Sequence, residues 1–424
     1  MYTKLIQETK LSWGATVLVA HFPAYGSVSF VGSVLGGTRS AKNTQIARVH
    51  AAMLMDGNTK RDKREIQLFL DSIGASLSFN TTRNRLTFTG RVRERHLDQL
   101  LGFITEALTE PTFPEVELEI LKKRDQASFS LAAQDTHTQA DIAITRMMYK
   151  SEHPNYSNTI GESRDNLLKL TRDDVRTYHQ KIVGRAGLIL SLAGNIKQPL
   201  ALRQIEKHFK KLPLKEVDFP SFRPGVTHKK QSKVLPIEHK ASIDYMTGIA
   251  TGITSDHKDY TALLLGLQVL GNPGGFTGRL MSTVREEEGL TYSIYAYMSG
   301  FSKELDGFIN VWATFAPELY TRGKAAVLRE IKKIVTKGIM PEEARKHREL
   351  YEARSRVQLA NSGSLARAAH EVVAQGYHVA RLDEFPQKVL RVTAAQANAA
   401  LKKYLLPDLL SESAAGPVKQ NATL

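Results

Sequence analysis

The chain contains the same succession of segments twice, and this repeat constrains its fold more than any other feature. A helical segment, a Pro-Glu pair and a second helical segment follow one another at 100–134 and again at 325–360. Proline in a first turn followed by an acidic residue is typical of a helix start. A third helical segment follows in each half, at 167–183 and 389–405. An internal duplication with similar spacing predicts two homologous domains.

Segments that alternate between apolar and polar residues, or that are apolar and rich in β-branched residues, frame these helices and predict strands. They lie at 15–22, 26–37, 75–92 and 187–196 in the first half, and at 242–253, 291–301 and 306–315 in the second. Strand pairs separated by long helices predict an α+β layer in each half.

The domain boundaries follow from a change in composition between the halves. Residues 213–235 are rich in proline and lysine and show no period, which predicts a linker. We therefore expect an N-terminal α+β domain at 1–212 and a C-terminal α+β domain at 236–424. The last residues, from Ser411 onward, are predicted to form a short frayed tail.

Composition excludes several classes of protein. The 424 residues include no cysteine, which rules out disulfides, thiolate metal sites and cysteine nucleophiles. The net charge of +15 raises three possible partners: nucleic acid, an anionic membrane or an acidic protein. The basic residues are scattered, without aromatic interleaving, and no apolar run is long enough to span a membrane. We expect no nucleic-acid partner and no membrane partner, and we interpret the charge mainly as solvated surface.

The N-terminal sequence lacks the apolar region and cleavage site of a secretory leader. We therefore expect a cytoplasmic protein, and the periplasm stays open if a leader has been removed.

The sequence lacks the common hydrolytic motifs. It has 13 histidines, and none lies in a His-x-x-Glu-His or His-Glu-x-x-His pattern. The nearest arrangement is His370, Glu371 and His378, where Gly376 interrupts the helix period, so we interpret these as packed or surface histidines. Gly-x-Ser-x-Gly and Walker sequences are also absent, which leaves esterase and nucleotide-hydrolase functions without support.

One helix has the setting of a zinc site without its ligands. Gly36-Gly37-Thr38-Arg39 ends a predicted strand, and a helix over 45–58 follows. This order resembles the zinc helix of the pitrilysin/insulinase peptidases, the inverzincins, whose signature is His-x-x-Glu-His. The resemblance extends over nearly the whole chain.

Aligning the family's Met-Leu-x-x-Gly sequence on Met53 assigns the four site positions. Arg48 and Ala52 then occupy the two histidine positions, and Ala51 occupies the general-base glutamate. The downstream glutamate position falls near Ser128. If this resemblance holds, none of these residues can act as its counterpart does.

The consequence follows from the side-chain chemistry. Ala51 cannot take a proton, Ala52 offers no lone pair, and Arg48 places a permanent cation where Zn²⁺ would lie. We expect no zinc in this chain. His50 lies off the metal-facing positions, and we interpret it as a helix-packing residue.

A second motif, at 271–300, retains functional residue types. A glycine-rich turn opens a helix that carries Arg285, and Tyr292 begins the next strand. Taken alone, the pattern also fits a helix C-cap at Gly289, with Arg285 stabilising the last turn and Tyr292 packed in the strand.

The motif resembles the C-terminal signature of the same family, in which this arginine and tyrosine hydrogen-bond the substrate's backbone carbonyl. Matching positions are Arg279, Leu280, Arg285, Glu286, Gly289, Leu290, Tyr292 and Ser293, whereas Gly278 and Thr291 depart from the signature. An arginine fork and a phenol are suitable donors to a carbonyl that becomes an oxyanion.

The resemblance implies a division of labour between two subunits. Family members of this length are clam-shells of two homologous domains, each with a mostly antiparallel sheet covered by helices. They form heterodimers in which one subunit holds His-x-x-Glu-His and zinc and the other supplies Arg and Tyr, as in the mitochondrial processing peptidase pair. The chain is thus expected to be the non-catalytic, zinc-less subunit of a bacterial heterodimeric metallopeptidase. It would bind peptide substrates and be inactive alone.

Two departures limit what carries over from the family. The long glycine-rich loop of the mitochondrial non-catalytic subunit is absent, so a role in presequence processing does not carry over. The segment matching the substrate-binding edge strand, Ser76–Thr82, has Ser78 and Phe79 where the family has Asn-Ala, which suggests that it holds no productive substrate. The alternative function is a structural, core-like subunit with no role in proteolysis.

Overall fold

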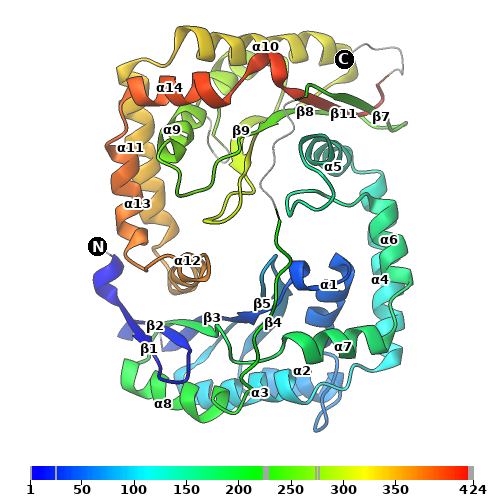
Figure 1. The fold of residues 1–424 in the computed structure, drawn as a ribbon, viewed down its shortest axis with the longest axis vertical. Coiled ribbons are helices and arrows are strands. Elements are labelled where there is room, and N and C mark those ends of the chain that lie inside the picture. The colour runs from blue at the N-terminus through cyan, green and yellow to red at the C-terminus, as the bar shows by residue number, and fades with distance from the viewer. Residues whose placement is uncertain (1, 24–25, 223–228, 273–274, 276, 419–424) are drawn as a thin grey trace. The chain divides into compact units, whose positions relative to one another are not determined.

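The computed structural model describes residues 2–23, 26–222, 229–272, 275 and 277–418. These residues form two compact units (Figure 1). Unit 1 comprises 1–127, 161–221 and 355–385, and unit 2 comprises 128–160, 222–354 and 386–424. Each unit therefore draws on segments from both halves of the sequence.

Unit 1 is built on a six-stranded sheet with the order β1-β2-β6-β3-β5-β4. Only β2 and β6 pair in parallel, and the other neighbours are antiparallel. The strands are β1 (Ile6–Lys10), β2 (Thr16–His21), β3 (Ser27–Leu35), β4 (Ser76–Thr81), β5 (Arg85–Arg93) and β6 (Ile189–Gly194).

The helices of unit 1 pack on this sheet and on one another. They are α1 (Thr44–Met53), α2 (Lys63–Ser72), α3 (Leu97–Thr109), the larger part of α4 (Glu115–Ala133), α6 (Ile160–Leu168), α7 (Arg172–Ile182), α8 (Gln198–Phe209) and α12 (Ser362–Ala374). Alternate residues of β5 enter the core, where the Phe88 ring stacks on Phe209 of α8 at 5.8 Å between centroids.

Unit 2 is built on a five-stranded sheet with the order β7-β11-β8-β10-β9, in which only β7 and β11 pair in parallel. The strands are β7 (Ser232–Pro236), β8 (Ile243–Ala250), β9 (Ile294–Ser299), β10 (Phe308–Phe315) and β11 (Ser411–Gly416). The helices are α5 (Thr136–Met148), α9 (Tyr260–Leu270), α10 (Tyr320–Lys337) and α14 (Ala394–Tyr404), with α11 (Pro341–Gln358) and α13 (Arg381–Leu390) extending into unit 1.

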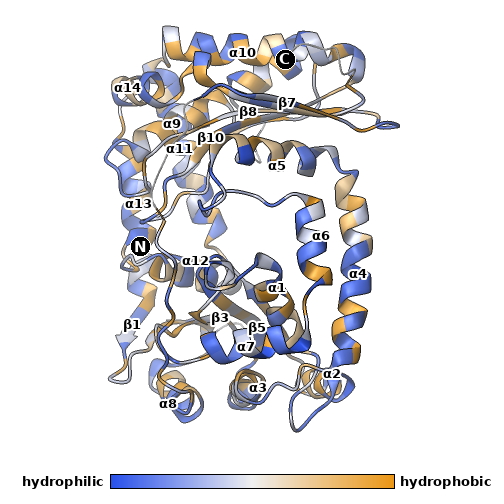
Figure 2. Ribbon diagram, turned by 45° about the vertical axis from the view of Figure 1, so that its right-hand side comes forward, coloured by the Kyte–Doolittle hydropathy of each residue, from blue (hydrophilic) through white to orange (hydrophobic). Residues whose placement is uncertain are grey.

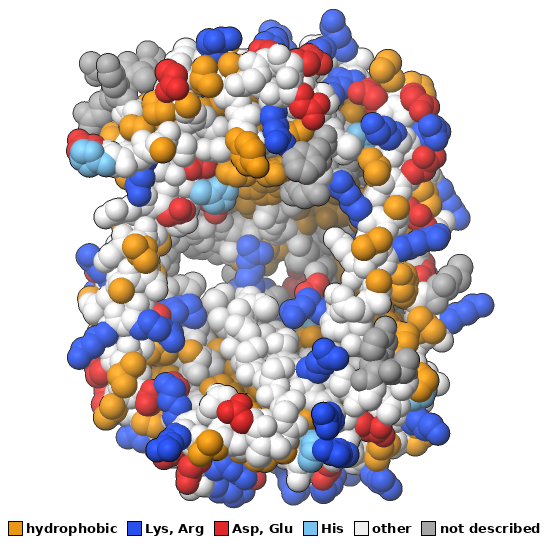
Figure 3. All heavy atoms as spheres, turned by 180° about the vertical axis from the view of Figure 1, so that it is seen from behind, with side chains coloured by type: hydrophobic (Ala, Val, Ile, Leu, Met, Phe, Trp, Pro, Cys, Tyr) orange, Lys and Arg blue, Asp and Glu red, His pale blue; other side chains and the backbone are white. Residues whose placement is uncertain are grey.

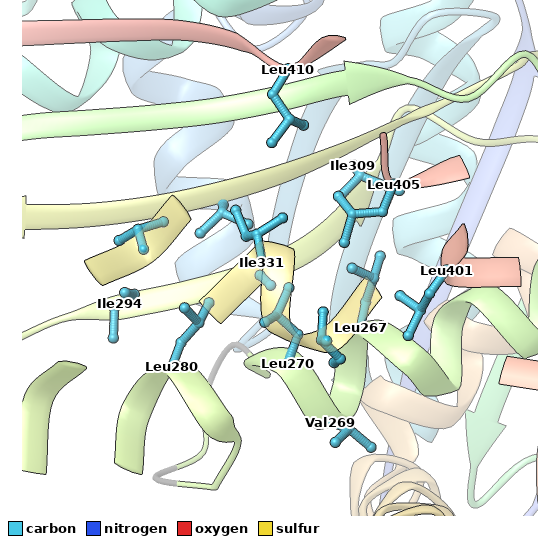
Figure 4. Packing of buried hydrophobic residues seen from close by; sticks show 14 of the residues in the cluster. Leu267, Val269, Leu270, Leu280, Ile294, Ile309, Ile331, Leu401, Leu405 and Leu410 are labelled. Carbon is cyan, nitrogen blue, oxygen red and sulfur yellow. The ribbon is translucent and has the colours of Figure 1, made fainter. Parts of the chain in front are cut away.

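The core of unit 2 lies between its sheet and the helices α9, α10 and α14. Figure 4 shows Leu267 and Leu270 of α9, Ile309 of β10, Ile331 of α10 and Leu401 of α14 in this cluster, and all five side chains are buried. Helix α10 is amphipathic, with hydrophobic and hydrophilic residues alternating along its ribbon (Figure 2). Helix α5 packs on the other face of this sheet, where Ile144 lies in one buried cluster with Met246 and Phe308, so both faces carry helices.

The predicted fold class is confirmed, because each half supplies a mostly antiparallel sheet covered by helices. The repeat is visible at single-residue level in α7 and α14. Each begins with a capping box in which a threonine, Thr171 or Thr393, accepts a hydrogen bond from the third backbone N–H and the third side chain, Asp174 or Gln396, accepts from the threonine N–H.

The frayed tail predicted from Ser411 onward is wrong for Ser411–Gly416. These residues form β11, which is fully buried between β7 and β8. Small side chains fit this crowded central position, and the backbone pairing on both sides supplies the order that the side chains do not signal. Residues 419–424 lie outside the described part of the chain. Residues 232–235, predicted as the end of the linker, belong to β7, whereas 223–228 lie outside the described residues.

Candidate functional site

The turn between β3 and α1 fixes the helix on which the sequence predicts the zinc-site positions. Gly37 has φ +89°, and a Cβ built on it would lie 2.4 Å from the Thr82 carbonyl oxygen, so only glycine fits there. Tyr178 of α7 holds the same turn, because its hydroxyl group donates to the Gly37 carbonyl at 2.9 Å. Asn43 then caps α1 by accepting from two backbone N–H groups.

Arg48, which the sequence predicts to occupy the family's first zinc-ligand position, forms an ion pair with α4. Nη2 of Arg48 lies 2.6 Å from Oδ2 of Asp125 on α4, and Nε of Arg48 donates to Gln45 at 2.9 Å. The Asp125 side chain is 8% exposed and the Arg48 side chain 40% exposed. A guanidinium thus joins α1 to α4.

The residues present do not fit a zinc ion. Ala51 is buried and Ala52 half-buried, and neither methyl group can ligate a metal or move a proton. Across the residues that the structure describes, no group of three or more His, Asp or Glu side chains is arranged to hold a metal ion.

The carboxylate that faces α1 was not found from the sequence. Sequence reasoning placed the downstream ligand position near Ser128, which is exposed on α4. Asp125 lies almost one helical turn earlier, on the same face, and makes the contact to Arg48. The sequence signal that could have identified Asp125 is an acidic residue three positions before Ser128, on the side of the helix that faces the core.

His50 is a packing residue, as predicted. It is buried on α1, with its Nε2 2.9 Å from Nδ1 of His179 and its ring against Phe113 and Tyr178. Burial lowers the pKa of His50 well below its usual value, with a smaller contribution from His179. The pKa of His179 falls to about 4, mainly by burial. Both imidazoles are therefore neutral at pH 7.

His370 and His378 do not share a helix face, because α12 ends before Gly376. His370 is buried, its Nε2 lies 2.6 Å from Oγ of Ser33, and burial lowers its pKa to about 3. His378 is 71% exposed. One of the two histidines is thus packed and the other lies at the surface.

Arg285 lies on a π-helix, η5 (Met281–Glu287), which is a single wide turn of a kind often found at functional sites. The turn closes at Gly289, where φ is +62° and Leu290 N–H donates to the Val284 carbonyl at 2.9 Å. The predicted C-cap at Gly289 is confirmed. Residues 273–274 and 276 of the glycine-rich turn lie outside the described residues.

Tyr292 does not pack in the strand. Its side chain is 78% exposed just before β9, so that part of the simpler interpretation is wrong. The guanidinium of Arg285 lies 4.9 Å from the centroid of the Tyr292 ring, and its Nη1 contacts Met281 Sδ at 3.4 Å. This cation–π contact holds a five-donor fork beside a solvent-facing phenol.

Neighbouring matches to the family signature are structural. Arg279 makes a bidentate ion pair with Glu343 at 2.8 and 2.7 Å and also donates to the Gly338 carbonyl, which ties the start of this helical segment to α11. In the same unit, His153 lies 2.9 Å from Asp306, and the Asn155 side chain donates to the Asp306 carbonyl at 2.8 Å. These contacts brace the connection between β9 and β10.

Comparison with models of protein families shows to which family the chain belongs. Residues 39–159 match the model described as Insulinase (Peptidase family M16), and residues 169–351 match the model described as Peptidase M16 inactive domain. The chain belongs to the M16 peptidase family.

Several M16 relatives cover most of the chain. The "Non-peptidase homolog YmxG" of Helicobacter pylori (strain ATCC 700392 / 26695) is 26% identical over 310 residues, which cover 73% of this chain and 70% of the relative. The "Uncharacterized zinc protease YmxG" of Bacillus subtilis (strain 168) is 22% identical over 402 residues, 93% and 94% of the two chains. A solved M16 inactive-domain structure from Pseudomonas fluorescens has the same fold, with a TM-score of 0.85, 21% identity and 98% coverage of both chains.

The match to the M16 inactive-domain model and the similarity to a relative named a non-peptidase homolog support a non-catalytic M16 member. The surface carries no single-sign field on the face that Figure 3 shows, where Lys and Arg side chains are interspersed with acidic ones. Within the described residues, no helix combines the length and apolar character needed to cross a membrane.

Proposed function

We propose that this chain is the zinc-less subunit of a heterodimeric M16 peptidase and that Arg285 and Tyr292 complete the active site of a partner that holds His-x-x-Glu-His and zinc. The observation that carries the proposal is a contrast within the chain. Arg48, Ala51 and Ala52 offer no metal ligand, whereas the half-buried Arg285 and the exposed Tyr292 offer hydrogen-bond donors side by side.

The two side chains can act on one oxygen atom. Arg285 offers N–H groups in a planar fork and Tyr292 offers one O–H, and the cation–π contact already holds them side by side. A peptide carbonyl gains negative charge on its oxygen as it is attacked, so donors placed beforehand stabilise the transition state more than the ground state. No lone pair or proton acceptor at Arg48, Ala51 or Ala52 could perform the hydrolysis itself.

The test compares the purified chain, its purified M16 partner encoded by the neighbouring gene, and the mixture, in a peptidase assay with metal analysis. We expect the chain alone to be inert and free of zinc, and the mixture to be active. Arg285→Ala or Tyr292→Phe should lower kcat of the mixture by about 10²–10³-fold, as is typical when one oxyanion donor is lost. Chelation of zinc should abolish the activity while leaving the circular dichroism of this chain unchanged.

Arg322→Ala is the matched control, because Arg322 is an exposed arginine of the same unit outside the motif. It should leave kcat unchanged. The complex itself should form with all three variants, which size-exclusion chromatography checks. A mixture whose activity is indifferent to Arg285→Ala and Tyr292→Phe would instead identify the chain as a structural, core-like subunit. Zinc bound at Arg48, Ala51 and Ala52 would refute the assignment of those positions.

A further inference from the structure

One face of the sheet in unit 1 is lined with hydroxyl groups. In the antiparallel pairing of β3, β5 and β4, Ser29 lies opposite Arg91 and Arg91 opposite Ser76. The next row on the same face places Thr89 opposite Ser78. Side chains two residues apart on a strand share a face, so these rows form one polar surface. The opposite face of the same strands carries Phe30, Phe79 and Phe88, which are buried.

The first turns of α12 border this polar surface and enclose a pocket of about 410 Å³. Its floor comes from β3, β4 and β5, and its wall from Asn361, Gly363, Ser364 and Arg367. The polar side chains in the lining are hydroxyl groups, one amide and the two arginines, Arg91 and Arg367, and no carboxylate lines the pocket.

The two arginines come from different elements and are both exposed. Ser27 of β3 orients the Arg91 guanidinium, whose Nε and Nη2 donate to Ser27 Oγ at 3.1 and 3.0 Å. Arg367 stands on α12, with Glu371 one turn further along the helix. Burial raises the pKa of Glu371, against the smaller opposite effect of Arg367.

We propose that this pocket binds the carboxylate of an acidic peptide, with Arg91 and Arg367 as its cationic ligands. Guanidinium groups match carboxylates in shape and charge, and the surrounding hydroxyl groups can donate the remaining hydrogen bonds. The pocket also borders β4, which is one of the two edge strands of the sheet, so an extended peptide backbone can lie beside it. Only the choice of a peptide as the ligand rests on the proposed function. The preference for a carboxylate is inferred from the residues that line the pocket.

The carboxylate can come from an Asp or Glu side chain or from a peptide C-terminus, and the experiment separates these sources. Fluorescence anisotropy with the full chain alone would use a labelled ten-residue peptide containing two central glutamates. The same peptide with glutamine at both positions, and both peptides with amidated C-termini, complete the set. We expect glutamate-to-glutamine replacement, C-terminal amidation or both to raise Kd at least tenfold. Whichever change does so identifies the source.

Arg91→Gln and Arg367→Gln should each raise Kd for the acidic peptide about tenfold, while Arg322→Gln in unit 2 leaves it unchanged. Both lining arginines are exposed, so the variants should keep the circular dichroism of the native chain. Equal binding of all four peptides, or unchanged Kd in both arginine variants, overturns the inference. Inorganic phosphate that displaces the peptide at a concentration where acetate does not would also overturn it, in favour of a phosphate site.

Because this chain is tested without a partner, a negative result leaves the effect of Arg285→Ala on the mixture untouched. Conversely, a mixture indifferent to Arg285→Ala, together with selective binding of acidic peptides, would leave the pocket assignment standing without the proteolytic role.

Discussion

The ion pair between Arg48 and Asp125 links two helices of unit 1, α1 and α4. Asp125 is nearly buried on α4, and its carboxylate accepts from Arg48 of α1 and from Nε of Arg124 at 3.2 Å. Burying a carboxylate without a partner costs free energy of folding. The guanidinium of Arg48 offsets that cost by pairing with Asp125. The cation that faces Asp125 is part of the Arg48 side chain, and its charge is permanent.

This arrangement predicts unequal effects for its two partners. Arg48→Met leaves Asp125 buried with only one cationic neighbour and should lower the free energy of unfolding by about 1–2 kcal/mol. Asp125→Asn keeps the shape and one acceptor, removes the buried charge and should cost less than half as much. The double variant should recover most of the loss, a coupling that urea unfolding of all four proteins measures. Additive single effects would show that the pair is not an energetic unit.

At the scale of elements, the repeated capping boxes give a second prediction. Thr171→Ala and Thr393→Ala each remove the hydroxyl group that accepts from the third N–H of α7 or α14. Each should lower the free energy of unfolding by about 1 kcal/mol. Thr336→Ala on α10 is the control, because Thr336 is exposed and bonds only to carbonyl groups of its own helix, at Lys332 and Lys333. It should change stability by no more than about 0.5 kcal/mol; a cost equal to that of the cap variants would contradict the capping explanation.

The elements that could be predicted from the sequence are those in which apolar and polar side chains recur with the period of a strand or a helix. Strands β2, β3, β4, β5, β6, β8, β9 and β10 and the long helices carry that signal. Strand β11 does not, because Ser411–Gly416 owes its conformation to hydrogen bonds with β7 and β8, which are distant in the sequence. Likewise, Arg285 could be singled out by its motif, but its π-helical turn and the exposure of Tyr292 depend on three-dimensional packing.

At the scale of the whole molecule, both units bury neutral histidines. Unit 1 contains His50, His179 and His370, and unit 2 contains His347, whose pKa burial lowers to about 4. In the unfolded chain each would titrate near its ordinary value of about 6.5. Below that pH the unfolded state binds more protons than the folded state. The free energy of unfolding therefore decreases as the pH is lowered. Each unit of difference in pKa contributes at most about 1.4 kcal/mol.

Urea unfolding between pH 7.5 and pH 5 should therefore show a fall in stability of several kcal/mol, in a range where most carboxylates remain ionised. Replacing the paired imidazoles together, as His50→Leu with His179→Leu, should flatten this dependence even if stability at pH 7.5 changes, because two of the titrating groups are gone. His239→Gln is the control, since the His239 side chain is 95% exposed and its replacement should leave the slope intact. A slope unchanged in the double leucine variant would mean that other groups govern the acid sensitivity of this fold.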